Sequence, residues 1–133
     1  MDDCIFCKII KGDIPSYKVY EDESTYCFMD IAKDVDGHML VVPKKHVTNV
    51  LDCDNDTLHA VMDTVKKVSN HLVDNCGYEG VNVLNATEKC AGQSVFHLHF
   101  HVIPRKTNDG IDGWPKFDGA KDEIEDTFNK IKM

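Results

Sequence analysis

The chain has little of what marks membrane proteins, nucleic-acid-binding proteins or secreted proteins. No apolar run approaches the roughly 20 residues of a transmembrane helix. The formal net charge is −8 over 133 residues, whereas a protein that binds a nucleic-acid duplex needs a basic face. The acidic start, Met1–Cys4, lacks the basic and apolar segments of a secretory signal. We therefore expect a cytoplasmic protein that binds no membrane and no nucleic acid, although local groups can still hold a small anion.

The chain also shows no disulfide pattern and no internal repeat. Its six cysteines are irregularly spaced, so in a reducing compartment we expect most to be free thiols. Hydrophobic residues make up 42% of the chain, which is enough for a core without metal or disulfide support. We expect one domain over residues 1–133, with a core at about 4–105 and a C-terminal tail at 106–133.

Hydrophobic periodicity predicts an α+β fold. Apolar residues at helical spacing predict one long helix over 54–76, with Asp52 or Asp54 capping its start and Gly77 ending it. Alternating segments predict five strands, at 17–21, 25–30, 38–42, 80–85 and 95–103. Pro43 would end the third strand and Pro104 the fifth. We also expect a short helix at 4–10, a loop at 107–119 and a short helix at 121–131. Short connections favour an antiparallel five-stranded sheet with the long helix on one face.

Three histidines alternate with apolar residues in the last predicted strand. His97, His99 and His101 would point to one side, and the core face would hold Phe96, Leu98, Phe100 and Val102. A strand rises about 3.3 Å per residue, so the outer two histidines would lie roughly 13 Å apart. One metal ion cannot reach all three histidines, although two of the histidines could share an ion. We therefore expect a nucleophile flanked by orienting or proton-handling groups. The alternative is a solvent-facing strand with incidental histidines.

The segment from Gly92 to Ile103 resembles the signature of the histidine triad (HIT) nucleotide hydrolases and transferases, His-x-His-x-His followed by apolar residues. Further segments resemble the family in the same order, at residues 5–10, 14–15, 28–31 and 37–46. The resemblance extends from about residue 4 to about residue 105. It implies a homodimer in which the long helix and the strand near 80–85 join two sheets into one.

The resemblance also implies roles for the histidines. His99 would attack phosphorus and form a nucleotidyl-histidine, with its other ring nitrogen bound to a backbone carbonyl. His38 would lie behind His99, and His97 and His101 would flank it. Further positions match contacts to the phosphate and the leaving group, namely the side chains of Gln93 and Ser94 and the backbone N–H groups around 92–94.

Other matching positions imply a nucleoside site. Asp30 corresponds to the acceptor of the ribose hydroxyls, and Asn85 to an amide near the phosphate. The apolar slot for a purine would consist of Ile5, Phe6, Ile9, Phe28 and Ile31. On the alternative interpretation, Asp30 is a strand-end or turn residue and the apolar side chains belong to the core. The two interpretations of the apolar side chains are compatible.

Cys4-x-x-Cys7 has no strand before it, so the pair does not fit a thioredoxin-like site. Family members with such a pair hold structural zinc, which implies the ligands Cys4, Cys7, His46 and His97 in this chain. The alternative is two buried thiols beside an ordinary histidine. His59 and His71 lie off the apolar stripe of the long helix, and we expect them at the surface.

The expected function is hydrolysis of nucleoside monophosphate derivatives, with purine nucleoside phosphoramidates as the leading substrates. A dinucleoside polyphosphate hydrolase is the second enzyme hypothesis, because residues 101–105 are closer to that branch. A zinc-stabilised nucleotide-binding or scaffold protein is the hypothesis from another class. A metal-dependent amidohydrolase is excluded, because that class usually needs a barrel of about 250 residues.

Overall fold

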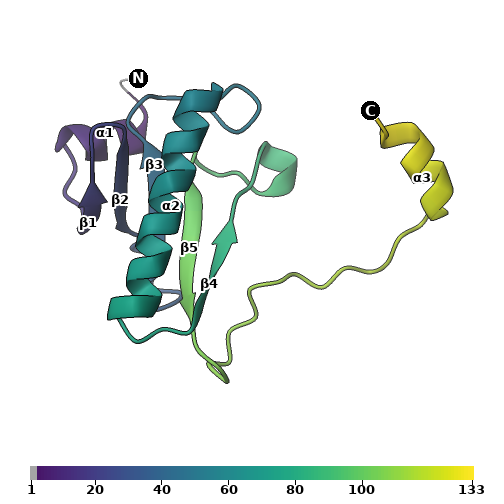
Figure 1. Cartoon of the computed structure of the whole chain (residues 1–133). Helices are drawn as coiled ribbons and strands as arrows, with labels where there is room; N and C mark the ends of the chain where they lie inside the picture. Colours follow the sequence, from purple (N-terminus) through teal and green to yellow (C-terminus); the bar gives the residue numbers. More distant parts are fainter. Residues whose placement is uncertain (1–2) are drawn as a thin grey trace.

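The computed structural model describes residues 3–133 and confirms the α+β fold with a five-stranded antiparallel sheet (Figure 1). The expectation for Met1 and Asp2 lies outside the described residues. The elements follow the predicted order: α1 (Ile5–Lys11), β1 (Lys18–Glu21), β2 (Thr25–Met29), β3 (Met39–Pro43), α2 (Asn55–Asn75), β4 (Gly80–Leu84), the 3-10 turn η1 (Lys89–Ala91), β5 (Phe100–Arg105) and α3 (Ile124–Ile131).

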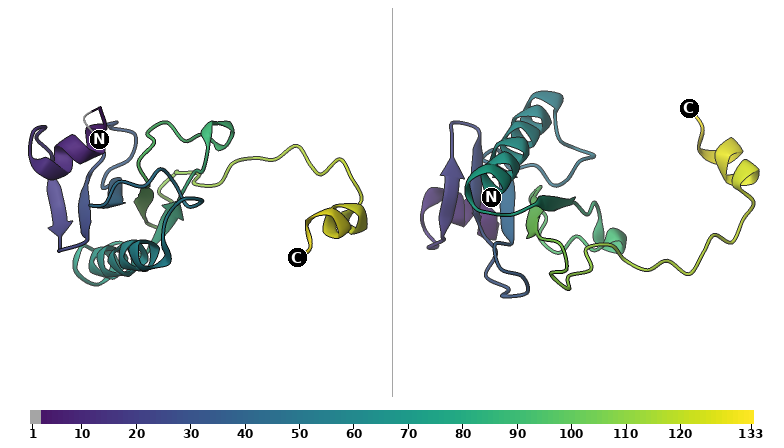
Figure 2. Two further views of the ribbon diagram at one scale, coloured as in Figure 1. Left: turned by 90° about the horizontal axis from the view of Figure 1, so that it is seen from above. Right: turned by 60° about the horizontal axis from the view of Figure 1, so that its bottom comes forward.

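The sheet has the strand order β1-β2-β3-β5-β4, and each face has its own core. On one face, α2 packs over a cluster that includes Val41, Leu98 and Val102. On the other face, Phe6 and Ile9 of α1 pack against residues of β2 and β3. Figure 2 shows the two helices on opposite sides of the sheet. Leu40 of β3 pairs with His101 of β5, so His101 faces the α1 side because Leu40 belongs to the cluster there.

The long helix forms where the apolar stripe predicts it. Asp54 is the N-cap and its carboxylate accepts the N–H of Thr57 at 3.0 Å, whereas the alternative cap, Asp52, accepts the N–H groups of Thr48 and Asn49. The buried stripe consists of Val61, Thr64, Val65, Val68 and Leu72. Neither α2 nor any other helix within residues 3–133 combines the length and the apolar character needed to cross a membrane.

The prediction of a strand over 95–103 is wrong at both ends. β5 begins at Phe100, because the preceding residues bond to the segment after β3 through single contacts, such as the N–H of Leu98 to the carbonyl of Val47 at 2.8 Å. Phe96 is 45% exposed and therefore not part of the core face. Pro43 is the last residue of β3, as predicted, whereas Pro104 does not end β5, because Arg105 continues the strand. Pro104 pairs only with β4, since the paired part of β3 stops at Met39, opposite Val102.

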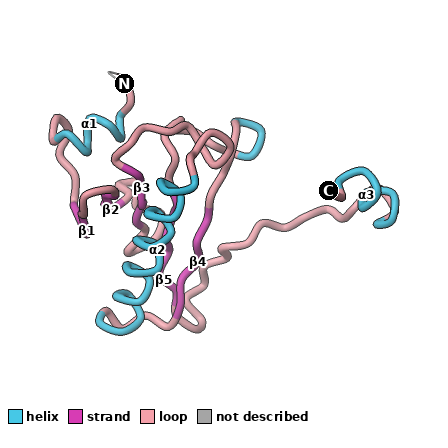
Figure 3. Tube along the Cα trace, turned by 45° about the horizontal axis from the view of Figure 1, so that its top comes forward, coloured by secondary structure: helices cyan, strands magenta, loops and turns pink. Residues whose placement is uncertain are grey.

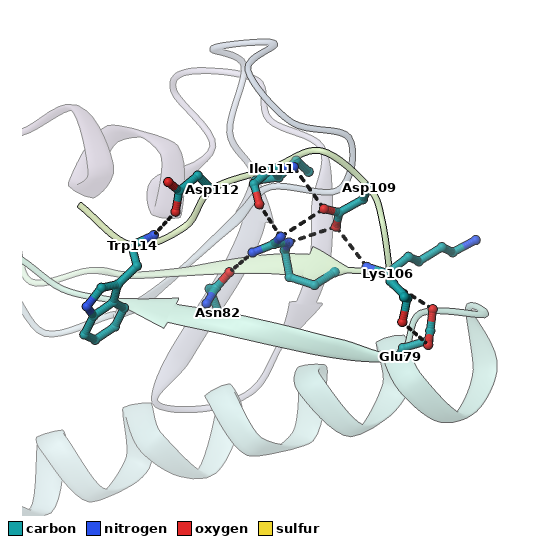
Figure 4. Close-up of polar contacts among 9 residues, drawn as sticks. Glu79, Asn82, Lys106, Asp109, Ile111, Asp112 and Trp114 are labelled. Carbon is teal, nitrogen blue, oxygen red and sulfur yellow. Dashed lines mark hydrogen bonds and ion pairs between the residues drawn. The ribbon is translucent and has the colours of Figure 1, made fainter. Parts of the chain in front are cut away.

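The C-terminal segment leaves the sheet as an arm. Figures 1 and 3 show α3 at the end of a long loop, away from the sheet, and residues 114–133 are all exposed. The root of the arm is held by Arg105, which donates to Asp109 at 2.8 and 2.9 Å, to Asn82 at 2.6 Å and to the carbonyl of Ile111 (Figure 4). Glu79 accepts two hydrogen bonds from Thr107 beside it.

Gly37 is a backbone position at which a side chain would be costly. Its φ is +82°, and an added Cβ would lie 2.7 Å from Cγ of Pro104. We expect Gly37→Ala to lower the free energy of unfolding by about 2 kcal/mol or more, from left-handed strain plus overpacking. Gly77→Ala is the control, because its φ is +81° and nothing lies within 4 Å of its added Cβ. This control should lose only about 1 kcal/mol. Urea denaturation measures both, and equal losses would contradict the close-contact argument.

Candidate active site

His99 lies just before β5 and has one ring nitrogen committed to the backbone. Its Nδ1 donates to the carbonyl of His97 at 2.8 Å, and the amide of Asn85 donates to the carbonyl of His99 at 2.9 Å. The ring lies beside Phe6 and His101, with ring centroids 5.1 Å away in each case. Burial lowers the pKa of His99, so its imidazole is neutral near pH 7. The lone pair of the neutral ring is therefore on Nε2.

The resemblance implies that His38 lies behind His99, and in the structure the hydrogen-bond partners of His38 are His101, which lies beside His99, and Asp34. Nε2 of His38 lies 2.8 Å from Nδ1 of His101, and Nδ1 of His38 donates to the carboxylate of Asp34 at 2.9 Å. The pairing follows from the register of the sheet, in which Met39 and Leu40 lie opposite Val102 and His101. The pKa of His101 is lowered to about 4, chiefly by burial of its ring.

A second cluster brings together Cys4, Cys7, His46 and His97, the residues that the family resemblance gives as metal ligands. Cys4 is the N-cap of α1 and Cys7 lies one turn later, so that both sulfurs face the same side. Nδ1 of His97 lies 3.4 Å from Sγ of Cys4, 3.5 Å from Sγ of Cys7 and 3.1 Å from Nδ1 of His46. All four ligand atoms lie within 4.8 Å of one another.

The geometry of this cluster fits a tetrahedral metal ion. Nε2 of His97 donates to the carbonyl of Pro43 at 2.8 Å, which leaves the lone pair on Nδ1, the atom that faces the other ligands. Zinc bonds of about 2.0–2.1 Å to nitrogen and about 2.3 Å to sulfur would separate tetrahedral ligands by about 3.3–3.8 Å. Burial raises the pKa of the Cys7 thiol and so favours its protonated form. A bound cation would act in the opposite direction and stabilise the thiolate. The residues present therefore fit a Cys2His2 ion site.

The residues expected to hold the purine gather around one cavity of about 150 Å³. Phe6, Ile9 and Phe28 are buried in its wall, whereas Ile31 is 80% exposed and lies at the surface. The carboxylate of Asp30 is 21% exposed at the same cavity. The resemblance did not assign to this slot five other residues that line the cavity, Ile14, Pro15, Ser16, Met29 and Leu40.

Ser94 lies at a different hollow, of about 470 Å³, which Cys4 and His46 of the Cys2His2 cluster also line. Its side chain is exposed, and His46, Thr48 and Phe96 line the same hollow. Ile5 lines both this hollow and the apolar cavity. A molecule that spans both spaces would therefore pass Ile5 at the start of α1.

Gln93 has a structural position. It is buried, and its amide group donates to the carbonyls of Thr48 and Val95 while its oxygen accepts from Asn49 and from the N–H of Glu88. Both hydrogens of the amide are therefore used within the protein. The N–H groups of Gly92 and Gln93 also bond within this loop, to carbonyls of Lys89 and Glu88. The expectation that these two N–H groups face the phosphate is wrong, because the 3-10 turn already uses them.

The sequence analysis missed Asp34 and correctly set aside two histidines. His59 and His71 are exposed on α2, as predicted. Asp34 lies four residues before His38 in a loop, and the Asp36-Gly37 pair in this loop is typical of a turn.

Comparison with known proteins gives relatives over nearly the whole chain. It is 38% identical over 136 residues to the adenosine 5'-monophosphoramidase of Schizosaccharomyces pombe, an alignment that covers 97% of this chain and 98% of that protein. It is also 38% identical over 108 residues to an adenylylsulfatase of Arabidopsis thaliana, with 81% of this chain and 55% of that protein covered.

Solved structures agree with this relationship. A crystal structure of SMU.412c from Streptococcus mutans superposes with a TM-score of 0.86 and 38% identity, and covers 98% of this chain and 82% of that one. A Zn-bound histidine triad family protein from Mycobacterium smegmatis gives a TM-score of 0.80 and 31% identity, with coverages of 88% and 85%. The HIT domain of the family matches residues 11–108. The chain therefore belongs to the HIT family.

Proposed function

We propose that the chain hydrolyses nucleoside monophosphate derivatives, with purine nucleoside phosphoramidates as the leading substrates, through a nucleotidyl-histidine on His99. The observation that carries this proposal is the bond from Nδ1 of His99 to the carbonyl of His97, which leaves the lone pair on Nε2 of a neutral ring. Relatives named as a monophosphoramidase and an adenylylsulfatase support a HIT-family hydrolase that acts on nucleotide derivatives.

In the first step, Nε2 of His99 attacks phosphorus and the bond to the leaving group breaks. The purine would occupy the apolar cavity between Phe6 and Phe28, and Asp30 at its edge would accept hydrogen bonds from the ribose hydroxyls. The leaving group would point toward the hollow that Ser94 lines, where the exposed hydroxyl can give a proton to the departing amine and take one from solvent in return.

In the second step, water attacks the phosphorus of the nucleotidyl-histidine and releases the nucleoside monophosphate. The bond between phosphorus and Nε2 breaks, and His99 returns to its neutral form. A covalent intermediate divides one difficult displacement into two easier ones. Asn85 holds the backbone of His99 through its carbonyl, so the ring can return to the same position in each cycle.

We also propose that the Cys4, Cys7, His46 and His97 cluster holds one structural zinc ion. The ion would fix the N-terminus of α1 against the segment that carries the reactive histidine. The distances of 3.1–3.5 Å between these ligand atoms support a tetrahedral ion.

The dinucleoside polyphosphate hypothesis rests on residues 101–105 and differs only in the leaving group. Arg105 gives it no support, because its guanidinium contacts Asn82, Asp109 and Ile111 at the root of the arm (Figure 4). Turnover of adenosine phosphoramidate and of a diadenosine polyphosphate, measured side by side, separates the two substrates. If the protein binds AMP but turns over neither substrate, the scaffold hypothesis replaces both.

Removal of the proposed nucleophile should abolish turnover. We expect His99→Gly to lower kcat by roughly three orders of magnitude or more, because the attacking atom is lost. Added imidazole should restore part of the activity, since it can occupy the vacated space. The affinity for AMP, measured by calorimetry, should barely change because other residues contact the base and ribose. Near wild-type turnover of the variant would refute the role of His99.

Loss of one sulfur should remove the metal. Purified protein should contain about one zinc ion per chain, whereas Cys4→Ser should lose it and unfold at a lower temperature, because a structural ion contributes folding free energy. Cys90→Ser is the matched control, since Cys90 is an exposed free thiol. Elemental analysis and thermal unfolding measure both effects. Equal metal content in the two variants would argue against this site.

We propose a homodimer through α2 and β4. β4 is an edge strand whose outer side has no partner among residues 3–133, so a second copy could extend the sheet across it. Sedimentation at micromolar concentration should give a species of twice the chain mass. A monomer at that concentration would contradict the proposal.

A further inference from the structure

A line of hydrogen bonds runs from the reactive histidines to the surface of the protein. His101 lies beside His99, His38 contacts Nδ1 of His101 at 2.8 Å, and Asp34 contacts Nδ1 of His38 at 2.9 Å. The side chain of His38 is only 7% exposed, whereas that of Asp34 is 52% exposed. Asp34 is therefore the point at which this buried chain of imidazoles meets solvent.

The chemistry of the partners fixes the direction of each hydrogen bond. The carboxylate of Asp34 only accepts, so Nδ1 of His38 carries a hydrogen. In neutral His38, Nε2 is then the acceptor, and Nδ1 of His101 must donate to it. The remaining nitrogen of His101, Nε2, therefore carries a lone pair and can take up a proton.

The loop between β2 and β3 is built to hold Asp34 in this position. The N–H of Asp30 donates to the carbonyl of His38 at 2.9 Å and closes the loop. The carboxylate of Asp34 also accepts the N–H of Val35 at 2.8 Å. Lys33 has a φ of +57°, and Gly37 packs closely on Pro104 with a φ of +82°. This loop can therefore place the carboxylate against His38 reproducibly.

We propose that Asp34 is a positioning residue that holds the His38–His101 pair in one tautomer and stabilises the charge that reaches His38 when His101 takes up a proton. This inference rests on the proposed function. In the hydrolytic step, Nε2 of His101 accepts a proton from the attacking water, and the Nδ1 proton of His101 moves to Nε2 of His38. The positive charge then lies on His38, which keeps its Nδ1–H toward the Asp34 carboxylate.

The surroundings of the two rings explain why the positive charge moves from His101 to His38. Burial and the neighbouring His99 lower the pKa of His101 to about 4, so a proton held on that ring alone is unfavourable. His38 faces two carboxylates: Asp34 at 2.9 Å and Asp30, whose Oδ2 is 3.7 Å from Nε2. Asp30 lies at the purine cavity, so Asp34 is the carboxylate that is within hydrogen-bond distance of His38 and outside that cavity.

Three variants separate the tautomer from the charge. Asp34→Ala removes both the acceptor and the charge, Asp34→Asn keeps an acceptor oxygen but removes the charge, and Asp36→Asn is the matched control in the same exposed loop. We expect Asp34→Ala to lower kcat roughly tenfold, by analogy with groups that orient metal-binding imidazoles. KM should change little, because Asp34 is not among the residues that line the purine cavity.

The pH profile gives a readout that a purely structural role would not move. The carboxylate favours the protonated pair, so its loss lowers the pKa of the pair. The acid limb of kcat should therefore move to lower pH in both Asp34 variants and stay in place in Asp36→Asn. A limb that stays in place in all three variants would overturn the charge role.

Histidine tautomers can be read without turnover, from long-range 1H–15N correlation spectra of the intact protein. We expect His38 protonated at Nδ1 in the wild type and in Asp34→Asn, and a mixture of tautomers in Asp34→Ala. An unchanged His38 tautomer in Asp34→Ala would overturn the positioning role. If wild type turns over no nucleotide derivative, the proposed function fails, yet these spectra still decide whether Asp34 sets the tautomer.

Discussion

The hydrogen bond from Nδ1 of His99 to the carbonyl of His97 is the contact on which the chemistry of this site depends. It leaves the lone pair on the opposite nitrogen and holds the ring in a single orientation. The same arrangement recurs in the neighbours: Nε2 of His97 is committed to the carbonyl of Pro43, and Nδ1 of His38 to the carboxylate of Asp34. In each ring, one committed nitrogen defines what the other can do.

His97 connects the proposed metal site with His99, the proposed nucleophile. Its ring faces Cys4, Cys7 and His46, while its carbonyl orients His99. An ion held by that ring would therefore also hold the carbonyl in place, although it touches no substrate. The N-terminal helix shares this arrangement, because Cys7 lies in α1 next to Phe6, whose ring packs against both His97 and His99. The packing of α1 and the orientation of His99 thus depend on the same few contacts.

The sequence predicted the elements well where periodicity was strong. The stripe of α2 and the core positions Leu98, Phe100 and Val102 came from spacing alone. Spacing failed at residues 95–99, because alternation cannot distinguish a paired strand from a bent segment held by single hydrogen bonds, such as that from the N–H of Leu98 to the carbonyl of Val47. The roles of Gln93 and Asp34 could not be predicted either. Both depend on partners that lie far away in the chain or across a loop, such as Thr48 for Gln93, and only the folded backbone brings these together.

The most direct test of the central claim is to identify the residue that carries the nucleotide during turnover. Wild-type protein mixed with adenosine phosphoramidate, quenched within milliseconds and digested, can be analysed by mass spectrometry for a nucleotidyl adduct. The account predicts the adduct on the peptide that contains His99, with fragmentation that assigns it to that histidine and not to His97 or His101. An adduct on another residue would contradict the account, as would steady turnover with no adduct at any quench time.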